Sequence, residues 1–250
     1  MIHEYTTPSG EYSRLYGDML QQVHLLIAGA TGAGKSTVVN GIMHAAMFHS
    51  PAAVRFILID PKGTELSEYA DLPHTIRYAQ ETTDCVRALS EALDITRTRF
   101  ADMKRNRSKM YNGSDIYIII DELMYLLNRP EYKRKALDML QDILVIARAA
   151  RVHVIACTQF IPMIPTCLRC NFDSKLALRT ATAQDSRNVI GVRGCECFPV
   201  PSIAHVAYGA YMTGGITTVY QLTQIPDADR ARLIQHWTRG AGRARRRLFA

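Results

Sequence analysis

Residues 29–36, GATGAGKS, have the types and the spacing that bind a chain of phosphates. They fit the pattern G-x-x-x-x-G-K-[ST], in which glycines let backbone N–H groups curl around a phosphate. The helix that starts here adds free N–H groups and the positive end of its dipole. In this pattern the lysine reaches the β- and γ-phosphates, and the last hydroxyl binds Mg²⁺. A glycine-rich turn without a ligand is the alternative. The predicted ATP-binding residues are Gly29, Ala30, Thr31, Gly32, Ala33, Gly34, Lys35, Ser36 and Thr37.

Two acids, Asp121 and Glu122, come directly after the apolar segment IYIII at 116–120. An enzyme with a phosphate loop needs a carboxylate at this place to hold Mg²⁺ through water. A second carboxylate can act as general base on the attacking water. A helix cap would also explain such a pair. Next to the phosphate loop, the pair predicts a Mg²⁺-dependent ATPase with Ser36 and Asp121 at the metal and Glu122 as the catalytic base.

A third polar residue, Gln159, follows the apolar segment 152–157 and Thr158. At the tip of a strand beside the phosphate loop, a glutamine can sense the γ-phosphate or position the water that attacks it. Read alone, Gln159 fits a surface loop equally well.

The segments that must position these residues alternate between strand and helix patterns. This order predicts an α/β fold with a mostly parallel central sheet flanked by helices. The expected strands are 23–28, 54–60, 116–120, 152–157, 175–179, 203–207 and 217–222. The expected helices are 35–48, 83–109, 132–150 and a short last one at 227–237.

The composition is that of a folded domain, since 48% of the 250 residues are apolar and 21% are charged. The longest apolar runs, such as 116–120, are far below the ~20 residues that a membrane-spanning helix needs. The first residues, MIHEYTTPSGEY, lack the pattern of a signal peptide. We therefore expect a cytoplasmic protein.

Positive charge is concentrated in two segments of a chain whose net charge is +7. Residues 95–113 hold six basic residues against one acid, and residues 239–250 hold five arginines and no acid. This concentration fits a polyanionic partner, nucleic acid first, and it fits a solvated helix face with a disordered tail about equally well. Contacts from such residues would bind phosphates without sequence preference. The predicted DNA-binding residues are Lys104, Arg105, Arg107, Lys109, Arg243, Arg245, Arg246 and Arg247.

Four of the six cysteines lie in two close pairs. Cys167 and Cys170 have the spacing of half a zinc site. Cys195 and Cys197 have only one residue between them, and no histidine lies close to either pair in the sequence. Ordinary thiols are therefore favoured over a zinc site.

With these features in place, the sequence resembles the motor domain of the FtsK/SpoIIIE family of DNA translocases. The segment RFILIDPKGTELSEYADLPH at 55–74 is the most specific match, because the family carries IDPK…EL…Y…LPH here. Four further segments match in family order: HLLIAGATGAGKSTVVNGI at 24–42, IIIDELMYLL at 118–127, ARAARVHVIACTQ at 147–159 and SKLALRTATAQDSRNVIG at 174–191. The resemblance extends from about residue 23 to about residue 222.

The resemblance implies a RecA-like P-loop ATPase that forms a ring, usually a homo-hexamer, and pumps double-stranded DNA through its centre. Nucleotide would lie between subunits, with Lys35, Ser36, Asp121, Glu122 and Gln159 from one of them. Arg148 falls where the family places the arginine that reaches the neighbouring subunit's nucleotide. Arg187, in Asp185-Ser186-Arg187, is the alternative catalytic arginine.

The chain also departs from the family. Phe160 stands where the family has an arginine after Thr-Gln, and few residues precede the phosphate loop. We expect a lead-in at 1–22, an ATPase domain at 23–238 and a basic tail at 239–250, as a compact version from a mobile element. Its expected work is DNA transfer, packaging or partition, together with a recruiting or membrane-bound partner protein. A secretion-type ATPase that handles protein and a non-motor P-loop protein, such as a small kinase, are the alternatives.

Overall fold

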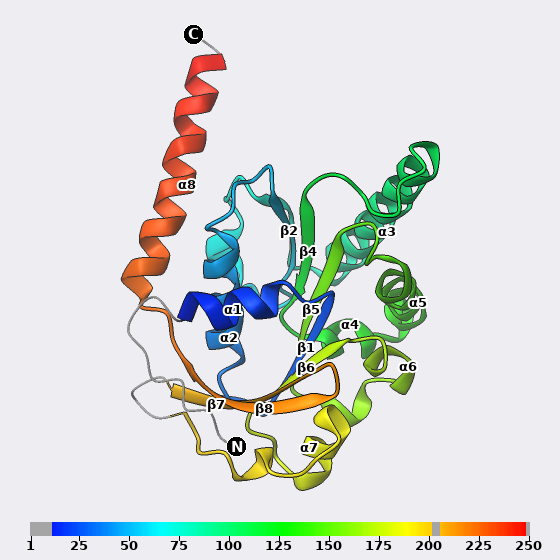
Figure 1. The fold of residues 1–250 in the computed structure, drawn as a ribbon, viewed down its shortest axis with the longest axis vertical. Helices are drawn as coiled ribbons and strands as arrows, with labels where there is room; N and C mark the ends of the chain where they lie inside the picture. The colour runs from blue at the N-terminus through cyan, green and yellow to red at the C-terminus, as the bar shows by residue number, and fades with distance from the viewer. Residues whose placement is uncertain (1–11, 202–205, 249–250) are drawn as a thin grey trace.

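The computed structural model describes residues 12–201 and 206–248, with the side chains of 12–14 and 240–248 left out. An eight-stranded sheet in the order β3-β2-β4-β5-β1-β6-β7-β8 forms the centre (Figure 1). The strands are β1 (His24–Ala28), β2 (Val54–Ile59), β3 (Thr75–Ala79), β4 (Asp115–Ile120), β5 (Val152–Thr158), β6 (Ser174–Ala177), β7 (Val206–Thr213) and β8 (Ile216–Thr223). The α-helices are α1 (Tyr12–Leu20), α2 (Lys35–Ala46), α3 (Thr82–Arg105), α4 (Leu123–Leu127), α5 (Pro130–Ile146), α6 (Thr166–Arg169), α7 (Ala183–Ile190) and α8 (Asp227–Leu248).

The strands from β3 to β6 are parallel, and β7 and β8 continue the sheet as antiparallel strands. The predicted α/β class with a mostly parallel sheet and flanking helices is confirmed. The central strands β1, β4 and β5 are buried on both faces, which is why each is a continuous apolar run. Because parallel strands end at one edge, the residues that follow β1, β4 and β5 are brought together there.

Helices cover both faces of the sheet. On one face α3, α4, α5 and α6 contribute to an apolar core, whereas α1, α2 and α8 pack on the other (Figure 1). Within the described residues, no helix has the length and apolar character to cross a membrane.

Two helices end earlier than their sequence patterns predict. The helix expected at 83–109 ends at Arg105, and Arg107 then takes a left-handed conformation with φ 51°. The helix expected at 132–150 ends at Ile146 and is followed by a turn of four residues and Arg151, whose φ is 55°. We call residues 147–151 the α5–β5 turn; Arg148 therefore lies in this turn and not in a helix.

The last third of the chain differs most from expectation. The strand predicted at 203–207 is wrong in its extent: β7 runs from Val206 to Thr213, and residues 202–205 are not among those described. Gly214 and Gly215, with φ 57° and 79°, form the two-residue turn that joins β7 to β8. The expected short helix at 227–237 continues as α8 to Leu248, so the prediction of its end is also wrong. The indole of Trp237 donates a hydrogen bond to the Met47 carbonyl, 2.8 Å away, and this contact holds α8 against the end of α2.

Candidate nucleotide site

The phosphate loop lies between the carboxyl end of β1 and the start of α2, and it needs its glycines. Gly32 and Gly34 have φ values of 73° and 99°, which favour glycine. A Cβ on Gly29 would lie 2.8 Å from the Cβ of Leu178, so the loop packs tightly on the chain after β6. The loop is also tied to both neighbouring strands, since the N–H of Gly29 donates to Thr158 and that of Ala30 to Arg179. These contacts fix a backbone that can present N–H groups to phosphates.

Lys35 lies at the first position of α2 and folds back over the loop. Its Nζ donates to the carbonyls of Gly29 and Ala30, each 2.9 Å away. Burial lowers the pKa of Lys35, and the nearby carboxylates Glu122 and Asp121 act in the opposite direction. The structure thus brings the predicted lysine and the predicted acids close enough to interact.

The acid pair follows β4, where both side chains are nearly buried. Glu122 is the N-cap of α4, because its carboxylate accepts the Met124 N–H at 3.3 Å. Burial raises the pKa of Glu122, and the backbone N–H groups of Met124 and Gln159 act against this shift. Burial, with the nearby carboxylates of Asp60 and Glu65, raises the pKa of Asp121 to about 6. Burial of the charged Asp121 carboxylate therefore lowers the stability of the folded protein.

The residues at this edge fit a magnesium site. Asp121 Oδ2 is buried and accepts no hydrogen bond from the part of the chain that the structure describes. An unpartnered buried carboxylate oxygen is available to bind a cation. Mg²⁺ is usually held by one or two carboxylates together with substrate phosphates, and a hydroxyl such as that of Ser36 completes the set in P-loop enzymes.

The unfavourable charge on Asp121 leads to a stability prediction. A carboxyl whose pKa is about 6 when folded and about 3.9 when unfolded costs about 3 kcal/mol at pH 7. Because the folded state binds the proton more tightly, this cost shrinks as the pH falls, to about half at pH 5. In the absence of nucleotide, Asp121→Asn should therefore stabilise the protein at pH 7.5 and stabilise it less at pH 5, as measured by urea unfolding. Asp138→Asn, at an exposed position on α5, is the control. An equal gain at both pH values would show that the charge of Asp121 is not the cause.

Gln159 follows β5, and β5 lies between β1 and β4 in the sheet. The hydroxyl of Thr31 in the phosphate loop donates to its Oε1 at 2.8 Å. The backbone N–H of Gln159 also approaches the Glu122 carboxylate. Gln159 therefore bridges the phosphate loop and the acid pair. This placement fits the expected sensor better than an unattached surface loop.

The loop after β2 is a part of the site to which the sequence analysis gave no role. The carboxylate of Asp60 is fully buried and accepts the N–H groups of Gly63, Glu65 and Leu66 at 2.9–3.0 Å. The Asp121 N–H donates to the Ile59 carbonyl, so this loop lies beside the acid pair. Lys62, which is exposed, lowers the pKa of Asp121 and Glu122 and is thus a second cation near the acids. In the sequence, this loop was visible only as the IDPK segment, which resembles the family but does not indicate that the loop contacts the acid pair.

The two candidate catalytic arginines lie at opposite ends of the parallel strands. Arg148 is exposed in the α5–β5 turn, before the amino end of β5. The seven residues of β5, at about 3.3 Å each, separate this turn from the phosphate loop by roughly 20 Å. Arg187 is exposed on α7, which follows β6 at the same edge as the phosphate loop. Arg148 therefore does not reach its own subunit's nucleotide site, as the expected role in a neighbouring subunit requires.

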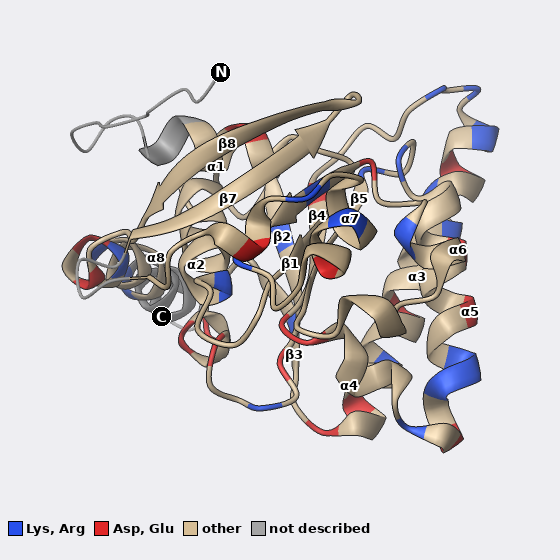
Figure 2. Cartoon of the chain, turned by 90° about the horizontal axis from the view of Figure 1, so that it is seen from below, with Lys and Arg blue, Asp and Glu red and all other residues tan. Residues whose placement is uncertain are grey.

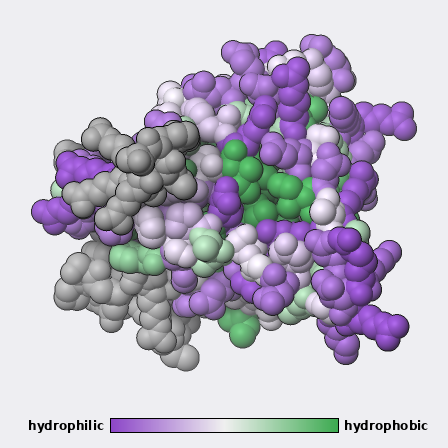
Figure 3. All heavy atoms as spheres, turned by 90° about the horizontal axis from the view of Figure 1, so that it is seen from above, coloured by the Kyte–Doolittle hydropathy of each residue, from purple (hydrophilic) through white to green (hydrophobic). Residues whose placement is uncertain are grey.

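The candidate DNA contacts Lys104, Arg105, Arg107 and Lys109 are exposed at the far end of α3 and in the loop after it. Figure 2 shows basic residues at this end of the molecule. Figure 3 views the edge of the sheet opposite the phosphate loop, where hydrophilic side chains surround a small apolar area. Arg243, Arg245, Arg246 and Arg247 lie in the last turns of α8, and their side chains are outside the described residues.

The cysteines are free thiols, with Cys167, Cys170 and Cys197 exposed. In the described residues, no three His, Cys, Asp or Glu side chains are grouped so that they could hold a metal ion. A magnesium site of Ser36 and Asp121 with phosphates needs no such group.

The sequence of this chain is similar to a known family. A sequence model of the FtsK/SpoIIIE family matches residues 9–198. The DNA translocase FtsK of Borreliella burgdorferi is 33% identical over 201 residues, which cover 72% of this chain and 25% of the relative. The chain spans about a quarter of the length of the curated relatives that it matches.

Solved structures share the fold. The pCW3 conjugation coupling protein TcpA, in monomer form with ATPγS, aligns with a TM-score of 0.72 at 19% identity and covers 87% of this chain and 66% of its own. The cytoplasmic domain of the type VII secretion ATPase EccC from Thermomonospora curvata aligns with a TM-score of 0.69 at 20% identity, over 86% of this chain and 28% of its own. At these identities the likeness shows a P-loop ATPase fold.

Proposed function

This chain belongs to the FtsK/SpoIIIE family, and on that premise we propose that it is an ATP-hydrolysing translocase of double-stranded DNA that works as a ring of subunits. The observation that carries the proposal is the site itself. The phosphate loop, the buried acid pair and Gln159 lie at one edge of the sheet. A hydrogen bond from Thr31 to Gln159 joins the loop to Gln159, and the Gln159 backbone N–H approaches Glu122. The proposed ring is a homo-hexamer of cytoplasmic subunits.

In the proposed mechanism the backbone N–H groups of residues 29–37 hold the phosphates of ATP, and Lys35 moves from the loop carbonyls to the β- and γ-phosphates. Mg²⁺, when bound by Ser36 and Asp121, neutralises charge on the phosphate oxygens. Glu122 accepts a proton from the attacking water, and Gln159 positions that water. Its raised pKa makes Glu122 a stronger base than an exposed glutamate. Arg148 from the neighbouring subunit completes the site, with Arg187 as the alternative.

The proposed DNA contacts are the basic residues at the end of α3 and in the last turns of α8. The exposure of Lys104, Arg105, Arg107 and Lys109 suits contacts with phosphates, which give affinity without sequence preference. DNA transfer, packaging or partition on a mobile element is the proposed setting, with a recruiting partner protein.

The test is ATP hydrolysis by the purified protein, with and without linear double-stranded DNA, at low and moderate salt. We expect DNA to stimulate hydrolysis several-fold and the effect to fade with salt, because bound phosphates release counterions. Changing Lys104, Arg105 and Lys109 together to glutamine should weaken DNA binding and lower its salt slope by about three. Changing Lys133, Arg134 and Lys135 to glutamine, at exposed positions on α5, is the matched control. Hydrolysis indifferent to DNA would count against the proposal.

A protein-handling ATPase of the secretion type is the second candidate. The fold similarity to EccC favours it, although at 20% identity that similarity concerns the fold alone. In that case the basic segments would contact subunits or a membrane surface. DNA-independent hydrolysis would favour this candidate over the first.

A further inference from the structure

Arg99 is a buried cation on α3 that none of the roles above uses. Only 7% of the residue is exposed. Its Nη1 donates to the carbonyls of Ala150, Ser114 and Arg151 at 2.8, 2.9 and 3.2 Å, and its Nη2 donates to Ser114 Oγ at 3.3 Å. A buried charge that satisfies carbonyls from two separate segments fixes those segments relative to each other. Here the segments are the start of β4 and the α5–β5 turn that carries Arg148.

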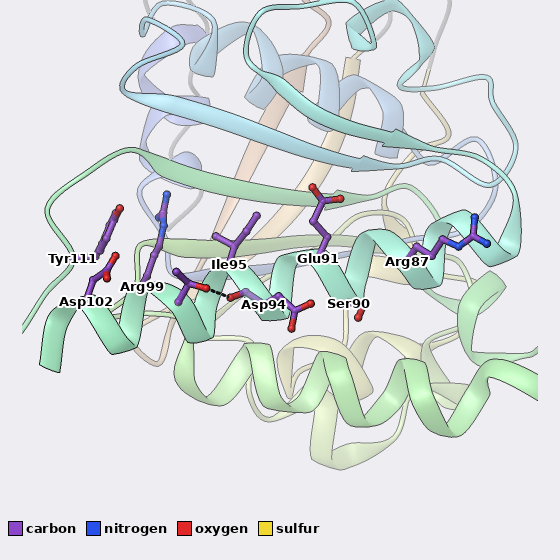
Figure 4. Close-up of a pocket in the computed structure, with 9 residues that line it drawn as sticks. Arg87, Ser90, Glu91, Asp94, Ile95, Arg99, Asp102 and Tyr111 are labelled. Atoms are coloured by element: carbon purple, nitrogen blue, oxygen red, sulfur yellow. Dashed lines mark hydrogen bonds between the residues drawn. The ribbon is translucent and has the colours of Figure 1, made fainter. Parts of the chain in front are cut away.

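Tyr111 connects the same turn to the loop after α3. The Tyr111 N–H donates to the Ala149 carbonyl at 2.9 Å. Its ring lies against Arg99, with the guanidinium carbon 4.4 Å from the ring centre. Figure 4 shows Arg99 and Tyr111 side by side at one end of a groove of about 530 Å³ that runs along α3. Arg99 and Tyr111 therefore connect the α5–β5 turn to α3 and to the loop that follows α3.

The candidate DNA contacts lie next to this pair in the chain. Residues 104–109 lie between Arg99 and Tyr111 in the chain. This segment turns back on α3, where the Ser108 N–H donates to the Met103 carbonyl at 2.9 Å. Lys109 is only two residues from Tyr111. A phosphate that draws residues 104–109 outward would therefore pull directly on Tyr111 and, through it, on the turn.

From these contacts we propose that Arg99 and Tyr111 are positioning residues that couple DNA bound at residues 104–109 to Arg148, and so to ATP hydrolysis in the neighbouring subunit. The proposal rests on the proposed function, since it needs both DNA-stimulated hydrolysis and an arginine supplied by a neighbour. It adds a route: the loop that carries the DNA contacts and the α5–β5 turn move together, because the Tyr111 ring and two carbonyls of the turn, Ala150 and Arg151, contact the same Arg99 side chain.

The experiment compares Arg99→Lys and Tyr111→Leu with the wild-type protein and with Arg97→Lys as the matched control. Lysine keeps the charge of Arg99 but lacks the planar fork that reaches several carbonyls, whereas Tyr111→Leu keeps apolar bulk but lacks the aromatic ring. Arg97 is exposed on the same helix, and its side chain forms an ion pair with Asp142 of α5 at 3.4 Å. ATP hydrolysis, the affinity for linear double-stranded DNA, and hydrolysis by mixtures with Glu122→Gln subunits are measured.

We expect Arg99→Lys to bind DNA within twofold of wild type but to lose nearly all of the several-fold stimulation of hydrolysis by DNA. Glu122→Gln subunits, which carry an intact turn, should restore part of that activity in mixed rings. A general folding defect would not be restored in this way. Tyr111→Leu should lose stimulation at least threefold, and Arg97→Lys should behave as wild type.

Wild-type stimulation in Arg99→Lys, or a loss that mixing does not restore, overturns the inference and leaves the proposed function standing. If Arg99→Lys does not fold, full stimulation in Tyr111→Leu overturns it instead. If DNA does not stimulate the wild-type protein, the proposed function and this inference both fail.

Discussion

Lys35→Ala should lower ATP hydrolysis at least a hundredfold while the protein stays folded. The reason is that Lys35 is the cation nearest the predicted phosphates, and removing a preorganised charge of this kind costs about 10²–10³ in rate. The side chain contributes little to stability, because burial lowers its pKa and its bonds go to two loop carbonyls. Hydrolysis under saturating ATP and thermal unfolding are the two measurements.

The matched control for this change is Lys133→Ala, at an exposed position on α5. It removes the same charge from a surface that has no proposed role, so its hydrolysis should equal that of the wild type. A wild-type rate in Lys35→Ala would show that the phosphate-loop assignment is wrong. A large fall in melting temperature would instead show that the bonds of Lys35 to Gly29 and Ala30 matter for folding.

Arg148→Ala should spare nucleotide binding and reduce hydrolysis about 10³-fold or more, as expected for an arginine that acts across a subunit boundary. The structure makes such a role necessary if Arg148 is catalytic, because β5 separates the α5–β5 turn from the phosphate loop of the same chain by roughly 20 Å. Mixing Arg148→Ala with Glu122→Gln subunits should therefore restore activity. In such rings some sites combine an intact Glu122 from one subunit with an intact Arg148 from its neighbour.

Arg187→Ala serves as the comparison in the same assay. If only Arg187→Ala is inactive alone and rescued in mixtures, the catalytic arginine is on α7 and not in the turn. If neither variant is rescued, the nucleotide site is not shared between subunits.

Most of the candidate site was predictable from the sequence, because its parts are short and local. The phosphate loop needs glycines at 32 and 34 for backbone angles that they alone adopt readily. Asp121 and Gln159 follow short apolar runs that are typical of buried strands, and parallel strands bring their carboxyl ends to one edge. The α/β class followed from the same alternation.

Features that depend on residues far apart in the chain could not be predicted from local patterns. The helical pattern of 132–150 extends to Ala150, yet α5 ends at Ile146, and Arg99 and Tyr111 bind the carbonyls of the turn that follows. The placement of Asp60 beside Asp121 depends on β2 pairing with β4, and that of Thr31 beside Gln159 on β1 pairing with β5. No local pattern encodes these pairings. Residue types and local spacing therefore predict which side chains can do the chemistry, whereas long-range packing places Arg148 at the opposite end of the strands and holds it there.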